Sequence, residues 1–405
     1  MPIEEQLNLA TAASLTLDPS PGGRGKNSPS PTGRRWGEAP DEGNTPGNEV
    51  RQLTFAQAIR EGLDQAMEHD PRVLLIGEGV PDPKAIFGTT AGLQQKYGTQ
   101  RVFDMPLAEN GMTGICIGAA LCGMRPVMVH QRIDFALLAV DQLVNNAAKW
   151  HYMFDGKASV PLVVRVIIGR GWGQGPQHSQ NLQALFAQMP GLKVVMPSTA
   201  FDAKGMLLSA IDDDNPVIFI EHRWLHHIAD AVPAEPYRVP LDRAKVLQAG
   251  EHVTVAAFSY MAMEALLAAR ALSNEGVHAE VIDMRSVRPL DLDTVAASVR
   301  KTGRLLVADT ASKTGSIGAE LVSRIAEQEF ASLRAAPVRV NCPDHPAPTS
   351  HFMAAQYYPD ALTIADAILD LAAVPRASID HARLQTTLLR TGPTDIPHQK
   401  FSGPF

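Results

Sequence analysis

Apolar residues recur at two spacings along the chain, and each spacing predicts a different kind of element. From Phe55 to Met67 they follow a helical interval, and Thr54 with Gln57 forms a capping box at the start of that helix. Short apolar runs bounded by turn residues predict strands buried on both faces. These runs are 73–76, 126–129, 161–168, 194–196 and 217–220. Helical patterns separate them at 111–123, 136–151, 181–188 and 200–211.

A second series of the same kind follows residues 233–242, a proline-rich and poorly patterned stretch that we interpret as a boundary. Its predicted strands are 253–258, 279–282, 305–308 and 338–340, and its predicted helices are 261–273, 292–299, 317–330 and 361–371. Strands that alternate with helices build parallel sheets with helices on both sides. The sequence therefore predicts an α/β protein with two three-layer α/β/α domains, at residues 51–235 and 243–374.

The two ends of the chain have no such pattern. Residues 1–50 are rich in Gly, Pro, Ser and charge, and such a segment cannot bury enough apolar surface to offset its ordering entropy. We expect a disordered N-terminal extension there. It lacks the apolar core of a secretory signal, and Glu4 and Glu5 are atypical of a transit peptide, so a cytoplasmic location is expected. Residues 375–405 show no convincing period and are expected to form a C-terminal tail.

The composition of the 405-residue chain is that of an ordinary globular protein, with 45% hydrophobic and 20% charged residues. A net charge of −7 argues against nucleic acid as a partner. No apolar run approaches the ~20 residues that a membrane span needs, so no membrane partner is expected. The three cysteines form no C-x-x-C pair, so neither a zinc knuckle nor a disulfide framework is indicated.

Two loops at predicted strand ends carry candidate chemistry. Glu109 stands at the start of a helix, where the helix dipole favours a carboxylate, although a plain surface acid has the same pattern. A glycine-rich loop at 169–179 follows a buried strand and contains His178, which can act as an acid or a base near neutral pH. Loops at this place form the ligand crevice of parallel sheets, but a flexible loop with an incidental histidine fits equally.

Two other clusters favour structural interpretations. Residues 212–215, with the sequence DDDN, are typical of a solvated turn. His222 and His226 have the i, i+4 spacing of metal ligands, with His227 beside them, but no H-E-x-x-H motif accompanies them. A metal site at these histidines is not favoured.

Five segments follow one another in a recognisable order. The first domain carries PLAENGMTGICIGAALCGMRPV, DFALLAVDQLVNNAAKWHYM and a long segment that runs from GPQHSQ to FIEH. The second domain carries EVIDMRSVRPLD and ADTASKTGSIGAEL. Together they resemble the β subunits of thiamin-diphosphate-dependent 2-oxo acid dehydrogenases, the family that acts on pyruvate, branched-chain 2-oxo acids and acetoin. The resemblance implies a pyrimidine-binding transketolase-like domain followed by a transketolase C-terminal-like domain.

The resemblance assigns roles to individual residues. Glu109 matches the glutamate that hydrogen-bonds the aminopyrimidine ring of the cofactor, and a buried carboxyl suits this role because desolvation raises its proton affinity. Phe135 matches the aromatic residue that packs on that ring, and Leu107 is expected to belong to the same cofactor site. His178 matches a histidine thought to assist acyl transfer to a lipoyl group. A potassium-binding loop of the family is matched by Leu162, Ala210, Asp213 and Asn215.

The resemblance also implies partners. The G-D-G…N motif that binds the diphosphate and magnesium in this superfamily is absent, since Asp155-Gly156 lacks the preceding glycine. An α subunit is therefore expected to hold the diphosphate and the magnesium, in an assembly of two α and two β chains. With this partner the chain would decarboxylate a 2-oxo acid and pass the acyl group to a lipoyl acyltransferase.

Two departures from the family pattern bear on the substrate. Relatives commonly have a second acid where Gly79 stands, and an apolar or aromatic run where this chain has HQRID at 130–134. The charged strand end suggests a polar or acidic substrate, and we expect Arg132 to contact a substrate carboxylate. A salt bridge from Arg132 to the α subunit is the alternative. The sequence does not indicate which 2-oxo acid is the substrate.

Two other functions fit the same domains. The C-terminal half of a split transketolase would move a ketol unit between sugars without a lipoyl partner, but the Q-H-S-Q segment at His178 favours the dehydrogenase. A non-catalytic assembly subunit would keep the fold and lose turnover, but the presence of Glu109, Phe135 and His178 argues against it.

Overall fold

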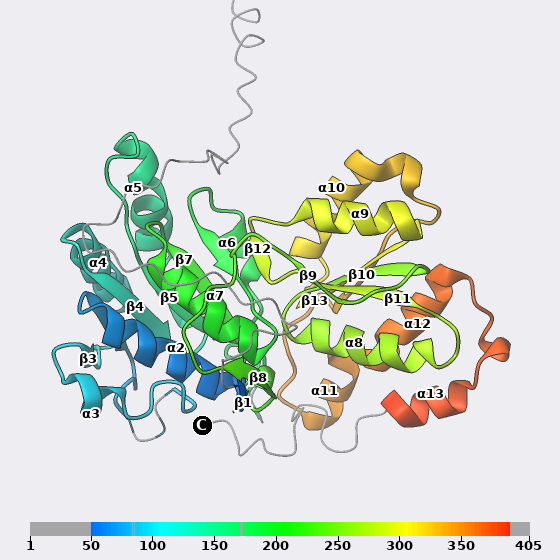
Figure 1. Ribbon diagram of the computed structural model, residues 1–405, viewed down its shortest axis with the longest axis horizontal. Helices are drawn as coiled ribbons and strands as arrows, with labels where there is room; N and C mark the ends of the chain where they lie inside the picture. Colours follow the sequence, from blue (N-terminus) through cyan, green and yellow to red (C-terminus); the bar gives the residue numbers. More distant parts are fainter. Residues whose placement is uncertain (1–49, 83, 85, 171–172, 389–405) are drawn as a thin grey trace, which may run out of the picture. The chain divides into compact units, whose positions relative to one another are not determined.

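The computed structural model describes residues 50–388, apart from residues 83, 85, 171 and 172 (Figure 1). The extension expected at residues 1–50 lies outside the described residues except for Val50, and so do residues 389–405 of the expected tail. Within the described part, strands and helices alternate and build two main sheets, as the apolar pattern predicts.

The first sheet has seven strands in the order β12-β6-β7-β5-β4-β2-β3. Its neighbours pair in parallel, except that β12 (Ser286–Arg288) joins the edge antiparallel to β6. The other strands are β2 (Val73–Gly77), β3 (Val102–Phe103), β4 (Arg125–His130), β5 (Val163–Ile168), β6 (Lys193–Val195) and β7 (Val217–His222). Strands β5 and β7 are buried along their whole length, which is why they appear in the sequence as nearly unbroken apolar runs.

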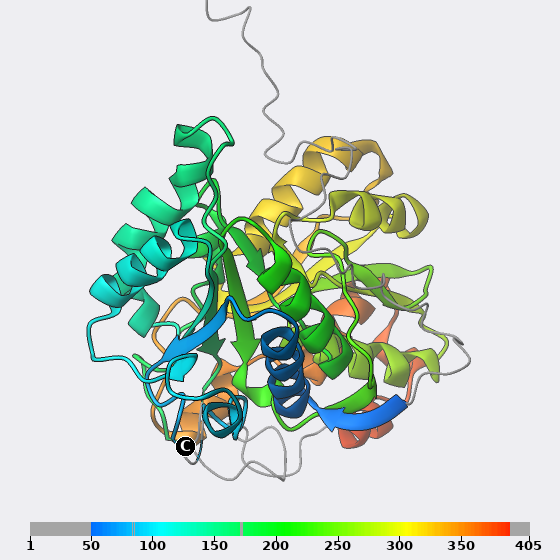
Figure 2. The same cartoon turned by 60° about the vertical axis from the view of Figure 1, so that its left-hand side comes forward.

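Helices cover both faces of this sheet. On one face α2 (Phe55–His69) and α7 (Ala200–Asp212) pack side by side, as Figure 2 shows. The predicted capping box is present at the start of α2, where Thr54 Oγ1 accepts a hydrogen bond from Gln57 N across 3.3 Å. The other face carries α4 (Glu109–Leu121), α5 (Ala148–Met153) and α6 (Gln183–Ala187).

The second sheet has five strands in the order β14-β13-β10-β11-β9 and is parallel apart from β9 (Lys245–Gln248). The parallel strands are β10 (Val253–Ala257), β11 (Ala279–Asp283), β13 (Leu305–Ser312) and β14 (Val338–Cys342). Helices α9 (Leu292–Thr302) and α10 (Ile317–Glu329) lie on one face, and α8 (Tyr260–Ser273) and α12 (Ala361–Ala372) lie on the other (Figure 1). Each half therefore has the three layers that the sequence predicts.

One apolar core runs through both halves. The buried cluster beneath α4 and α6 continues to Phe258 and Leu321 of the second half. Buried polar contacts reinforce the junction, since Gln183 Nε2 donates to Asp309 Oδ1 across 2.6 Å. Strand β12, contributed by the second half, completes the edge of the first sheet.

The helix predicted at 136–151 is not continuous. A 3₁₀ turn (Phe135–Ala139) and a π-helical turn (Gln142–Ala147) precede α5. The changes of turn width keep the same face buried, and that face is formed by Ala136, Ala139, Leu143 and Ala147. A single helical period therefore describes the burial of this segment but not its backbone.

The expected tail at 375–405 begins with ordered structure. A 3₁₀ turn (Arg376–Ser378) leads to α13 (His381–Leu388), whose Leu384 and Leu388 are buried in the core cluster around α8. Two buried leucines in one short helix are too few to show a period in the sequence. The apolar pattern also missed several short elements. They are β1 (Val50–Thr54), α3 (Leu93–Tyr97), β3, η3 (Arg223–Leu225), β8 (Ala229–Pro233), β9, β12, η4 (Phe330–Ser332) and α11 (His351–Tyr357).

Within the described ranges, no helix is both long enough and apolar enough to cross a membrane.

Candidate functional site

The candidate site lies at the carboxyl ends of the parallel strands of the first sheet, the edge at which open α/β sheets bind ligands. Glu78 directly follows β2, Glu109 follows β3, Arg132 follows β4 and the loop of His178 follows β5. Because β5, β4, β2 and β3 are consecutive in the sheet, these four connections are neighbours in space. The fold thus brings together residues that are up to about 100 positions apart in the sequence.

A pair of carboxyl groups stands at one end of this edge. Glu109 is the first residue of α4, where the helix dipole favours negative charge, and it is 5% exposed. Burial, together with the negative charges of Glu109 and Asp104, raises the pKa of Glu78 to about 7. Neighbouring carboxylates resist ionising together, so the pair can retain one proton at neutral pH.

The backbone at Gly79 accounts for one departure from the family pattern. Its φ is +72°, and a Cβ at this position would lie 2.7 Å from Gln131 Nε2. That nitrogen donates to Glu78 O across 3.1 Å, while Gly79 N donates to Asp104 Oδ1 across 2.9 Å. An acid at this position would need a strained backbone and would displace Gln131. Glu78 is therefore the acid that remains beside Glu109.

A single turn after β4 holds three residues of the site. Phe135 N donates to Arg132 O across 3.3 Å, and within this turn Asp134 Oδ2 lies 2.9 Å from His178 Nδ1. The ring centroids of Phe135 and His178 are 5.4 Å apart. Because an ionised carboxylate can only accept, Nδ1 carries the proton and Nε2 of His178 is left as a base.

Side-chain amides connect the start of α4 to this turn. Asn110 Nδ2 donates to Leu138 O across 3.4 Å, and Gln142 Nε2 donates to Asn110 Oδ1 across 3.2 Å. Leu107, just before α4, is 82% exposed and offers apolar surface close to Glu109. The contacts hold the acid pair and the Phe135–His178 rings in one region.

A buried ion-pair network lies among the same strand ends. Arg165 Nε donates to Glu221 Oε1 across 2.6 Å, and His226 Nε2 lies 3.2 Å from Glu221 Oε2. Burial lowers the pKa of His226 to about 4, which keeps the ring neutral. Among the described residues, no group of three or more His, Cys, Asp or Glu side chains is placed to hold a metal ion. His226 is thus a neutral neighbour of Glu221 in this network.

Comparison with known proteins assigns both halves of the chain to one superfamily. Residues 51–227 match the family "Transketolase, pyrimidine binding domain", and residues 242–364 match "Transketolase, C-terminal domain". The β subunit of acetoin:2,6-dichlorophenolindophenol oxidoreductase from Cupriavidus necator is 42% identical over 329 residues, covering 78% of this chain and 97% of that one. The chain belongs to the family of pyruvate and acetoin dehydrogenase β subunits.

Further relatives agree. The β subunit of the pyruvate dehydrogenase E1 component of Porphyra purpurea is 42% identical over 291 residues, covering 72% of this chain and 88% of its own. A solved structure titled "Split gene transketolase, inactive beta4 tetramer" superposes with a TM-score of 0.66 over 80% of this chain and all of that one, at 22% identity. That likeness shows the shared fold. The 42% identities to the dehydrogenase and oxidoreductase β subunits, and not this 22% likeness, distinguish the dehydrogenase family from the split transketolase.

The predicted potassium loop of this β subunit lies at the opposite edge of the sheet, at the amino ends of β5 and β7. Leu162 O accepts from Val217 N across 2.9 Å, and Ala210 O accepts from Asp213 N across 3.3 Å. Asn215 N donates to Asp213 Oδ1 across 2.9 Å. The structure brings the four predicted residues together, but it places them far along the strands from the acid pair and His178.

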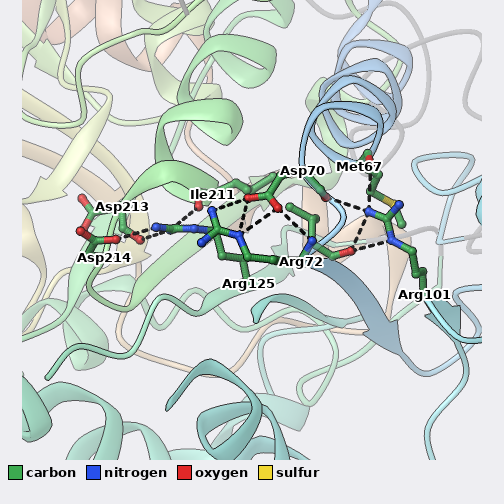
Figure 3. A network of polar contacts seen from close by, with 9 residues as sticks. Met67, Asp70, Arg72, Arg101, Arg125, Ile211, Asp213 and Asp214 are labelled. Atoms are coloured by element: carbon green, nitrogen blue, oxygen red, sulfur yellow. Dashed lines mark hydrogen bonds and ion pairs between the residues drawn. The ribbon is translucent and has the colours of Figure 1, made fainter. Parts of the chain in front are cut away.

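Two side-chain cations already occupy this loop, and Figure 3 shows one of them, Arg125. Arg125 Nη1 donates to Ile211 O across 2.9 Å and to Asp213 O across 3.1 Å, and its Nη2 lies 2.6 Å from Asp214 Oδ1. Lys193 Nζ also pairs with the Asp213 carboxylate. A potassium ion on the Asp213 oxygens would be repelled by both groups. The loop therefore fits potassium poorly.

Sequence reasoning did not identify two residues of the site. Glu78 had a usable signal, because an acid directly after a buried strand lies at the ligand-binding edge. Asp134 had none, because its importance comes from a contact with His178, which is 44 positions away.

Proposed function

We propose that this β subunit forms half of a thiamin diphosphate site in a 2-oxo acid dehydrogenase and that an α subunit forms the other half. The observation that carries the proposal is that the pair of Glu78 and Glu109 lies at the same edge of the sheet as the rings of Phe135 and His178. With the α subunit, the protein decarboxylates a 2-oxo acid and transfers the acyl group to a lipoyl acyltransferase.

The described residues fit the aminopyrimidine end of the cofactor. Glu109 would hold a proton against the ring, Phe135 would pack on it, and Leu107 would add apolar contact. The neighbouring Glu78 strengthens the hold of the pair on that proton, since burial and like charge favour the neutral carboxyl. When bound, the cofactor supplies a nucleophilic carbon and an electron sink for the loss of carbon dioxide.

His178 is suited to the second half of the reaction. Its Nδ1 is engaged by Asp134, so the proton it can give or take is the one at Nε2. The imidazole side chain is 42% exposed, so a lipoyl sulfur that arrives from outside the chain can reach it. General acid–base assistance of this kind contributes about 10²- to 10⁴-fold to a rate.

The surface beside the site has the character of a subunit contact. Gly111, Ile115 and Gly118 form an exposed stripe along α4, and a Cβ on either glycine would meet no atom within 4 Å. Leu107 and Leu138 extend the exposed apolar surface next to it. Such patches mark interaction sites. We assign this one to the α subunit, which would hold the diphosphate and magnesium in an assembly of two α and two β chains.

The test is to purify a tagged form of this chain from cells that produce it and to assay what accompanies it. A near-stoichiometric chain with the G-D-G…N motif should copurify. The complex should reduce 2,6-dichlorophenolindophenol with a 2-oxo acid, and the isolated chain should not. Glu109→Gln should lower this rate roughly 10²-fold or more. Recovery of the chain by itself, or ketol transfer between sugars by the complex, would contradict the proposal.

A further inference from the structure

Arg132 is a buried cation that forms no direct ion pair with a described residue, although the charge of Asp134, two positions along the chain, acts on it. It is 3% exposed, and its guanidinium donates one hydrogen bond, from Nη1 to Gly169 O. Its Nη2 has no hydrogen-bond partner among the described residues, and no ion pair joins it to any of them. Leaving a buried charge without a partner costs a folded protein several kcal/mol. An arginine kept in this state is therefore expected to have a ligand.

A second guanidinium increases the local positive charge. Arg132 and Arg223 lie over the same Phe87 ring, with their central carbons 5.6 and 4.3 Å from its centroid. Burial, and after it the charge of Arg132, lowers the pKa of Arg223 to about 9, while burial lowers that of Arg132 to about 10. Both groups remain charged at neutral pH, and a neighbouring anion would relieve their repulsion.

Arg132 lies close to the residues that are proposed to contact the cofactor and the acyl group. Arg132 O accepts from Phe135 N, so the two residues stand at the ends of one tight turn, within about 7 Å of one another. Phe135 is the residue proposed to pack on the cofactor, and Asp134 between them orients His178. An anion held by Arg132 is therefore one turn away from the reacting groups. In the sheet, β4 lies between β5, which leads to His178, and β2 and β3, which lead to Glu78 and Glu109.

We propose that Arg132 binds a second anionic group on the substrate, so that the favoured substrates are dicarboxylic 2-oxo acids. This inference rests on the proposed function and specifies its substrate class. The half-buried Phe87 ring covers the guanidinium and is the group that an entering carboxylate displaces. A salt bridge from Arg132 to the α subunit is the alternative. The two are separated by the substrate dependence of the Arg132→Met variant, since a bridge that supports assembly would affect every substrate equally.

The test uses the purified complex of this chain with its α subunit and two substrates of matched shape. They are 2-oxoglutarate and 5-methyl-2-oxohexanoate, in which two methyl groups replace the distal carboxylate oxygens. Dye reduction is measured for the native complex and for Arg132→Met, Arg132→Lys and the exposed control Arg324→Met. The native complex should favour 2-oxoglutarate in kcat/KM by roughly 10²-fold, the size of one charged hydrogen bond made in a buried site. Arg132→Met should remove this preference, because it should lower kcat/KM far more for 2-oxoglutarate than for 5-methyl-2-oxohexanoate. Arg132→Lys should retain part of the preference, and Arg324→Met should leave both rates unchanged.

A second measurement needs no variant. Saturating 2-oxoglutarate should raise the Tm of the native complex more than the same concentration of 5-methyl-2-oxohexanoate. A native preference for the neutral substrate, or an equal loss with both substrates in Arg132→Met, would overturn the inference while the proposed function stood. If pyruvate and both test substrates all failed to reduce the dye, the proposed function would fail first, and this inference with it.

Discussion

Asp134 Oδ2 lies 2.9 Å from His178 Nδ1, and this contact selects the tautomer of the only histidine in the proposed catalytic group. Asp134→Asn replaces an acceptor by an amide that can also donate, so Nε2 loses its assignment as the base. We expect the lipoyl-dependent rate to fall roughly 10- to 100-fold and the pH profile of kcat to change. Dye reduction, which bypasses the lipoyl group, should fall much less.

The matched control for this prediction is Asp141→Asn. Asp141 carries an exposed carboxylate in the next turn and pairs only locally, with Asn145 at 2.7 Å and Gln142 at 3.3 Å. It should leave both rates unchanged. If Asp134→Asn lowered dye reduction and lipoyl transfer by the same factor, the contact would be structural and the role of the tautomer would be wrong.

The acid pair makes a prediction about stability and pH. The pKa of Glu78 in the folded chain is raised from 4.5 to about 7, first by burial and then by the charges of Glu109 and Asp104. A raised carboxyl pKa destabilises the folded chain. This destabilisation is absent below pH 4.5, grows between pH 4.5 and 7, and is complete above pH 7. Glu78→Gln removes this cost. Its Tm should therefore exceed that of the native chain at pH 8 and equal it near pH 4.5.

The comparison needs a glutamate on the open surface, and Glu327→Gln on α10 serves this purpose. It should track the native chain at both pH values. A Glu78→Gln chain that was less stable than the native one at pH 8 would show that Glu78 is held as a carboxylate and that the pair does not share a proton.

A comparison of Gly79 with Gly88 separates two costs of adding a side chain, the strain of the backbone and the displacement of a neighbouring side chain. Both have positive φ, +72° and +86°, but a Cβ at Gly88 meets nothing within 4 Å, whereas a Cβ at Gly79 meets Gln131. Gly88→Ala should cost about 1 kcal/mol of unfolding free energy from the backbone alone. Gly79→Ala should cost more, because Gln131 must release Glu78 O, and denaturant unfolding measures both. Equal costs would mean that Gln131 moves freely and does not set the residue at position 79.

Subunit contact along α4 can be tested with one charge. Ile115 is 60% exposed on the stripe between Gly111 and Gly118. Ile115→Glu should reduce recovery of the α subunit strongly, since a buried unpaired charge at an interface costs several kcal/mol. Leu267→Glu, at a 52% exposed leucine of α8 in the second half, is the matched control and should not. Normal recovery of the α chain with Ile115→Glu would place the contact elsewhere.

The loop at Asp213 should not respond to potassium. Arg125 and Lys193 already supply its positive charge, so exchanging sodium chloride for potassium chloride at constant ionic strength should leave the Tm of the native chain unchanged. Arg125→Met should lower the Tm, because the carbonyls of Ile211 and Asp213 lose a charged donor, at about 1–3 kcal/mol. Arg72→Met, which removes a more exposed ion pair with Asp70, should be milder. A saturable rise of Tm with potassium alone would show that the ion binds.

The sequence determined the architecture of this protein. Buried parallel strands must be apolar on both faces, so β5 and β7 were visible as apolar runs, and the alternation with helices fixed the layers. Resemblance located Glu109, Phe135 and His178, and the structure places all three at the carboxyl edge of the first sheet. These predictions succeeded because the burial of a strand or helix is written in the local pattern of apolar residues. The prediction of one continuous helix at 136–151 and the prediction of an unstructured start of the tail were wrong, because that pattern does not report changes of helical turn or very short helices.

Tertiary structure alone decided how these residues act. Glu78 has a raised pKa only because β2 and β3 are neighbours, which puts Glu109 and Asp104 beside it. Asp134 orients His178 only because β4 and β5 end at the same edge. The predicted potassium loop is filled by Arg125, which reaches it from β4, a different strand. Charge–charge contacts between separate strands leave no trace in the spacing of residues along the chain, because the sheet order, and not the sequence order, makes them neighbours.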